Sequence, residues 1–163
     1  MFTLSPGGGK VNLHSIYAEP ERPTDRSELT AKDFAGWIAW AREKGFGLDY
    51  NGSFFAHPMM DNSLSLSSPK EDVRKFWIRH GITSREISAA MGKATGQTCV
   101  HNIWIPDGLK DIPADRYAYR NRLTDSLDQI FKAKLNPSEM VDTLEGKLFG
   151  IGVESFTVGS HEF

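Results

Sequence analysis

The stretch C-V-H-N-I-W-I at residues 99–105, followed at once by P-D-G at residues 106–108, decides the fold. Its β-branched and aromatic side chains, and the proline and glycine that stop it, are typical of a strand inside a sheet. Because side chains alternate along a strand, Asn102 and Trp104 share one face and the residues between them share the other. Helical patterns flank this strand on both sides.

Upstream of the strand, the spacing of apolar residues predicts two consecutive helices. A hydroxyl cap and a proline at residues 67–69 begin the first, and Gly81 ends it. The second runs from Ser84 to Gly96. His80 falls in the last turn of the first helix, where a cation suits the helix dipole.

Two further helices are predicted, one from Thr30 to about Lys44 and one from Ala114 to about Lys134. In the earlier helix, Trp37 and Trp40 belong to the apolar stripe that faces a sheet. The buried stripe of the later helix is predicted to contain Tyr117, Leu123, Leu127, Ile130 and Phe131.

Three more strands are predicted, at residues 10–17, 47–51 and 143–149, whereas residues 153–159 fit either a loop or a strand. Strands and helices therefore alternate along the chain. This order predicts an α/β fold with about four parallel strands joined by crossover helices. We expect residues 1–163 to form a single segment with residues 1–9 as a flexible leader, because the glycines at 7–9 lack the spacing of a phosphate loop.

The composition allows one ordinary globular core: 163 residues, 39% of them apolar and 25% charged. A formal net charge of -2 gives no basic field, so nucleic acid and anionic membranes are not expected partners. No apolar run approaches the ~20 residues of a membrane span, and the N-terminus does not resemble a signal peptide, so we expect a cytoplasmic protein. Cys99 is the single cysteine of the sequence, so an internal disulfide is excluded. We interpret it as a small buried side chain rather than a nucleophile.

A carboxylate and an amine alternate in the last predicted strand, at Glu145 and Lys147. Side chains two apart on a strand share a face, so the pair forms either an ion pair on a solvated strand or part of a buried site. His57, Trp104 and Asp107 are expected at the same end of a parallel sheet. A lone glutamate cannot hold a divalent ion, and no H-x-x-x-H, H-x-H or C-x-x-C motif accompanies it.

Several long motifs resemble one family. They are K-V-N-L-H-S-I-Y, G-L-D-Y-N, F-F-A-H-P, V-R-K-F-W-I-R-H, N-I-W-I-P-D-G-L-K-D, K-L-N-P and L-E-G-K-L-F-G-I-G-V-E-S-F-T-V-G-S-H-E-F. Together they closely resemble bacterial L-rhamnose isomerase over nearly the whole chain from Lys10. The resemblance implies a metal-dependent aldose–ketose isomerase on a (β/α)8 TIM barrel of the xylose isomerase type, which converts L-rhamnose to L-rhamnulose.

Residue roles follow from the same resemblance. Glu145 matches a carboxylate ligand of manganese, and Lys147 matches a lysine that stabilises or protonates the carbonyl oxygen of the open-chain sugar. Trp104 matches a tryptophan that walls the sugar pocket, and His57 lies in a loop resembling the one that reaches the distal hydroxyls. The family also implies Mn2+, with a second divalent ion such as Zn2+ as an option, and a homo-oligomer, a tetramer, for the complete enzyme.

The chain departs from the family in length, because it covers less than half of the enzyme. The resemblance implies that the later aspartate and histidine ligands are absent, so we expect a fragment that is inactive by itself. A non-catalytic remnant that acts as a sugar-binding or association module is the alternative. Another barrel enzyme of the same superfamily, acting on a different sugar, is a third interpretation.

Overall fold

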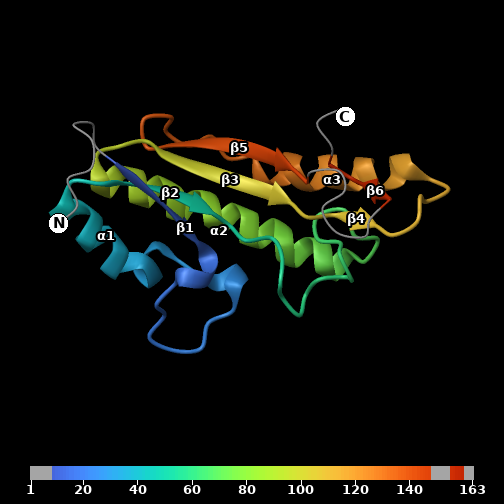
Figure 1. The fold of residues 1–163 in the computed structure, drawn as a ribbon, viewed down its shortest axis with the longest axis horizontal. Coiled ribbons are helices and arrows are strands. Elements are labelled where there is room, and N and C mark those ends of the chain that lie inside the picture. The colour runs from blue at the N-terminus through green and yellow to red at the C-terminus, as the bar shows by residue number, and fades with distance from the viewer. Residues whose placement is uncertain (1–8, 148–154, 160–163) are drawn as a thin grey trace.

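The computed structural model describes residues 9–147 and 155–159 (Figure 1). Its strands and helices are, in order, β1 (Lys10–His14), α1 (Ala35–Lys44), β2 (Gly47–Asn51), α2 (Glu71–Thr95), β3 (Cys99–Ile105), β4 (Gly108–Leu109), α3 (Arg116–Ile130), β5 (Met140–Gly146) and β6 (Phe156–Thr157). Short 3-10 helices at Ser15–Tyr17, Arg26–Glu28 and Ala31–Phe34 fill the connection between β1 and α1.

The main sheet of the described residues has the spatial order β1-β2-β3-β5, and each neighbouring pair is parallel. Sheet neighbours are also sequence neighbours, because α1, α2 and α3 each connect one strand to the next. The short strands β4 and β6 pair antiparallel as a separate ribbon. The predicted α/β fold with four parallel strands and crossover helices is confirmed for this part of the chain.

The helices pack on one face of the sheet, and the core lies between the two layers (Figure 1). Residues of β3 alternate between buried and half-buried side chains, as the sequence pattern predicts. Ile103 and Ile105 pack with the α2 residue Trp77 and the α3 residue Ile130 in one apolar cluster. Cys99 is fully buried in a second cluster nearer the N-terminus, so its prediction as a core residue is confirmed.

The predicted break between two helices at Gly81 is wrong, because α2 continues through it for 25 residues. Gly81 is buried where α3 packs against α2, and a Cβ atom at this position would lie 2.6 Å from Ile130 Cδ1. A glycine that ends a helix and a glycine that admits a neighbouring helix look the same in sequence. Packing against α3 therefore overrides the helix-ending preference of glycine.

We expect Gly81→Ala to destabilise the chain although alanine favours helix. The new methyl group would overlap the Ile130 side chain, and overpacking a filled core costs about 1–3 kcal/mol. Gly36 in α1 is the matched control, because its Cβ would meet only the end of the Glu19 side chain. Gly36→Ala should be neutral or stabilise by up to about 1 kcal/mol. Urea unfolding followed by circular dichroism measures both; equal effects would refute the packing explanation.

His80 does not sit in a last helical turn, so its predicted pairing with a helix dipole is also wrong. Its side chain is buried in mid-helix, where Nδ1 lies 3.1 Å from the Arg26 carbonyl oxygen and Nε2 contacts the Gly52 carbonyl oxygen. Burial lowers the pKa of His80 to about 4, against the opposing effect of the two carbonyls. A neutral His80 has a single N–H, so it donates to one of these two carbonyl oxygens and joins α2 to the segments that follow β1 and β2 through one hydrogen bond and one close contact.

The buried neutral His80 predicts acid sensitivity. The unfolded chain binds a proton at this imidazole near pH 6.5, whereas the folded chain does so near pH 4. Stability should therefore fall as the pH decreases through this interval, by about 3 kcal/mol at most from His80. His101, whose pKa burial also lowers, acts in the same direction. Urea unfolding between pH 7 and 4 should show a shallower slope for His80→Gln; an unchanged slope would contradict the assignment.

Several predicted element ends shift. β1 stops at His14 because Ser15 turns away, with its Oγ donating to the Gly52 carbonyl oxygen at 2.7 Å. β5 begins at Met140, three residues before the predicted start, and pairs with β3 from there. Its predicted end at residue 149 lies outside the described residues, as do residues 1–8 of the leader predicted at residues 1–9. The last residue of that leader, Gly9, accepts a hydrogen bond from Gly47 N.

Two aromatic residues were wrongly predicted to face the core. Tyr117 is 67% exposed at the start of α3, whereas Leu123 and Ile130 of the same stripe are buried. Trp40 is 37% exposed and stacks on Phe46 instead of facing the sheet. Helical spacing identified the apolar face of each helix, but it did not show which residues of that face the sheet covers.

Candidate active site

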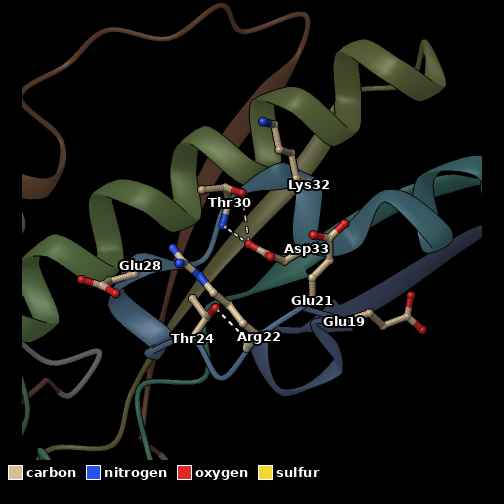
Figure 2. Close-up of a pocket in the computed structure, with 8 residues that line it drawn as sticks. All are labelled: Glu19, Glu21, Arg22, Thr24, Glu28, Thr30, Lys32 and Asp33. Atoms are coloured by element: carbon tan, nitrogen blue, oxygen red, sulfur yellow. Dashed lines mark hydrogen bonds between the residues drawn. The ribbon is translucent and has the colours of Figure 1, made fainter.

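A cavity lies in the connection between β1 and α1, not at the strand ends. Its volume is about 610 Å³, and Figure 2 shows the side chains that line it: Glu19, Glu21, Arg22, Thr24, Glu28, Thr30, Lys32 and Asp33. Thr30 N and Thr30 Oγ1 both donate to Asp33 Oδ2, an arrangement that caps the following 3-10 helix. None of the predicted site residues lines this cavity.

The open face of the sheet carries the predicted residues. The half-buried residues Asn102 and Trp104 of β3 lie on the face opposite the helices, beside the exposed Thr143 and Glu145 of β5. The parallel register places Asn102 next to Thr143 and Trp104 next to Glu145, in the last rows before the strands end. Carboxyl ends of parallel strands are where α/β proteins bind ligands. The structure thus brings Trp104 and Glu145 together.

Glu145 is held by a hydrogen bond that the sequence did not suggest. Asn102 Nδ2 donates to Glu145 Oε2 at 2.6 Å, and Thr143 Oγ1 lies 3.0 Å from Asn102 Oδ1. A carboxylate has about four lone-pair positions, so one such bond leaves Glu145 able to bind a cation. Lys147 follows β5 directly and is half-buried.

Trp104 contacts the loop after β2 through Phe55, a residue to which the sequence pattern assigns no role. The two rings meet edge to face with centroids 5.2 Å apart. Arg26 supports this loop, because its Nη1 donates to the carbonyl oxygens of Ser53 and Phe55 at 2.6 Å each. Ser53 adopts a positive φ of 54°, a conformation that persists in a non-glycine residue only when its surroundings impose it.

His57 packs against α2. Its imidazole stacks on Phe76 of α2 at a centroid distance of 4.8 Å, and its Nδ1 accepts a hydrogen bond from Met59 N. It also lines a cavity of about 380 Å³ with Arg26. Burial lowers the pKa of His57, and the positive charge of Arg26 adds to that effect. The structure therefore places His57 beside α2, and its predicted sugar contact stays a prediction.

Asp107, expected near the same strand ends, is completely buried. Its carboxylate accepts hydrogen bonds from the backbone N and hydroxyl groups of Ser65 and Ser67, with Ser65 N at 2.9 Å and Ser67 N at 2.8 Å. Asp107 thus fastens the loop before α2 to the end of β3. Its geometry is that of a structural anchor.

The chemistry of the Glu145 carboxylate suits a divalent cation such as manganese, because Mn2+ favours carboxylate oxygen as a ligand. Glu145 would supply one ligand. Within residues 9–147 and 155–159, no group of three or more His, Cys, Asp or Glu side chains could hold a metal ion. The described part of the chain therefore does not form a metal site by itself.

These features define an α/β protein whose polar and aromatic side chains gather at the carboxyl ends of parallel strands. Comparison with known proteins gives the family. The family model described as L-rhamnose isomerase (RhaA) matches residues 1–163. The chain belongs to the L-rhamnose isomerase family.

Individual relatives agree with the family match. The chain is 49% identical over 162 residues to the L-rhamnose isomerase of Listeria monocytogenes, covering 99% of this chain and 39% of that protein. It is 51% identical over 160 residues to the enzyme of Cronobacter sakazakii (98% and 38% covered) and 48% identical over 162 residues to that of Rhodopirellula baltica (99% and 38%). The chain thus spans about two fifths of the length of these relatives. None of the described helices has both the length and the apolar character of a membrane span.

Proposed function

We propose that this chain is a segment of an L-rhamnose isomerase, which interconverts L-rhamnose and L-rhamnulose as a complete protein. The observation that carries the proposal is the family match over residues 1–163, combined with Glu145 and Trp104 side by side at the strand ends. By itself the segment would be inactive, because the described residues do not form a metal site by themselves.

The fold of the complete enzyme is proposed to be a (β/α)8 barrel. Four sequential parallel strands with helices on one face are what half of such a barrel contains. The exposed apolar side chains Val141 and Leu144 on the edge strand β5 support a continuation of the sheet beyond this strand. The proposed homo-oligomer and the second divalent ion stay predictions.

Within that enzyme, Glu145 would bind manganese, which when bound polarises the sugar oxygens at C1 and C2 as a Lewis acid. The ammonium of Lys147 would stabilise negative charge that develops on the carbonyl oxygen while hydrogen moves between the two carbons. Trp104 and Phe55 would form an apolar wall that excludes water and contacts the methyl group of a 6-deoxy sugar.

The alternative is a non-catalytic sugar-binding or association module. The short length relative to the curated relatives and the lack of a metal site among the described residues favour it over a self-sufficient enzyme. An isomerase of the same family that prefers a different aldose shares the chemistry and would differ only in the sugars it converts.

Calorimetry distinguishes a segment that is inactive by itself from a module that binds sugar by itself. The test compares this chain with a hybrid enzyme, in which the chain replaces the matching 162 residues of the Listeria monocytogenes protein. Each is titrated with L-rhamnose in the presence of Mn2+. We expect heat of binding from the hybrid enzyme and none from the chain at millimolar sugar. Tight binding by the chain alone would favour the module.

A further inference from the structure

The open face of the sheet contains a short chain of hydrogen bonds that ends on Glu145. Thr143 and Asn102 lie next to each other in the register of β5 and β3, and Glu145 lies one row further along, beside Trp104. The distances are 3.0 Å from Thr143 Oγ1 to Asn102 Oδ1 and 2.6 Å from Asn102 Nδ2 to Glu145 Oε2. Three side chains from two strands are thus connected in series.

Hydrogen-bond chemistry fixes the direction of this series. An ionised carboxylate can only accept, so the amide of Asn102 must present its NH2 group to Glu145. The amide oxygen then faces Thr143, whose hydroxyl donates to it. That hydroxyl has one proton, and the His101 carbonyl oxygen, 3.2 Å away, is a competing acceptor for it. The carboxylate therefore fixes the orientation of the amide, and the shorter Thr143 contact, at 3.0 Å, supports the same orientation from the other end.

We infer that Asn102 is a positioning residue for the Glu145 carboxylate, and that Thr143 sets the orientation of Asn102. This inference rests on the proposed function, in which Glu145 is a manganese ligand. A glutamate side chain at an exposed strand position has three rotatable bonds, and a charge-assisted hydrogen bond restricts them. With Oε2 held by the amide, the carboxylate is oriented before a cation arrives.

Groups that orient metal ligands strongly affect affinity, and their loss typically costs about 10- to 100-fold. Asn102→Leu keeps the approximate volume and removes the donor, so Mn2+ affinity of the hybrid enzyme should fall by about this factor. Thr143→Val, which is nearly isosteric, should lower the affinity less, by a few-fold on the same reasoning. Thr143→Ser retains the hydroxyl and should restore wild-type affinity.

Electron paramagnetic resonance of free Mn2+ measures these affinities without reference to turnover. Asn121→Leu and Thr124→Val on the exposed surface of α3 are matched controls for the same changes in side-chain chemistry. Thermal unfolding of each variant separates a loss of fold from a loss of affinity. If Asn102→Leu does not fold, the Mn2+ affinities of Thr143→Val and Thr143→Ser still test the positioning role. Equal affinities of these two variants would contradict it.

A metal-free measurement tests the geometry directly. In this chain alone, the Asn102 side-chain NH2 signals in a nitrogen–proton correlation spectrum should shift when Glu145 is changed to glutamine, and the Asn121 signals should not.

Failure of the inference and failure of the proposed function have different signatures. If Glu145→Gln abolishes Mn2+ binding while folded Asn102→Leu binds within twofold of wild type, the positioning role is overturned and the function stands. If Glu145→Gln leaves Mn2+ affinity unchanged, the proposed metal ligand itself is wrong and the inference falls with it.

Discussion

Glu145→Gln should abolish manganese-dependent isomerisation of L-rhamnose in the hybrid enzyme. The amide keeps the shape of the side chain but removes its negative charge, and a neutral amide oxygen is a much weaker ligand for the cation. We expect turnover to fall by about 1000-fold, which corresponds to about 4 kcal/mol of transition-state stabilisation. Initial rates of L-rhamnulose formation at saturating Mn2+ measure the effect.

Glu86→Gln is the matched control, because Glu86 lies exposed on α2, on the helix side of the sheet. It should leave turnover unchanged. Rates for Glu145→Gln within a few-fold of wild type would show that this carboxylate neither binds the cation nor contacts the reacting sugar.

Arg85→Met should be the most destabilising single change outside the site. The Arg85 side chain is 7% exposed; its Nε lies 3.1 Å from both carboxylate oxygens of Asp142, and its Nη1 donates to the carbonyl oxygens of Ile130 and Ala133 at 2.9 Å. One guanidinium thus joins α2, the end of α3 and β5. Removing it leaves two carbonyls without this donor and the Asp142 carboxylate with only the hydrogen bond from His101, which should cost about 3–5 kcal/mol.

The Asp142 carboxyl shows how the network is balanced. Burial alone would raise its pKa, but hydrogen bonds from His101 and Arg85 hold the pKa below its ordinary value. Equilibrium urea unfolding of this chain measures the loss for Arg85→Met. Arg79→Met removes an exposed arginine of the same helix, 3.7 Å from Glu28, and should cost less than about 1 kcal/mol. Similar losses for both variants would refute the network.

The sequence predicted the order of strands and helices well, because each depends on local periodicity. The alternation in residues 99–105 identified a strand and the side chains on each of its faces, and the structure confirms both. What local patterns could not supply was tertiary context. Gly81 carries the sequence signal of a helix end, yet its lack of a side chain serves the packing of Ile130.

The candidate site was predicted only in part, because it too depends on tertiary context. Glu145 and Trp104 could be named from the sequence, but their adjacency depends on the register between β3 and β5, which no local pattern contains. Asn102 was placed on the correct face without a role, because its role follows from a hydrogen bond across 43 residues of sequence. Phe55 was missed because its only distinguishing feature is the contact with Trp104.

Turnover of L-rhamnose by the hybrid enzyme tests the central claim most directly. A folded hybrid enzyme supplied with Mn2+ should convert L-rhamnose to L-rhamnulose, lose that activity on chelation and regain it when Mn2+ returns. A hybrid enzyme that folds and binds Mn2+ but forms no L-rhamnulose would contradict the assignment of this chain to a working L-rhamnose isomerase.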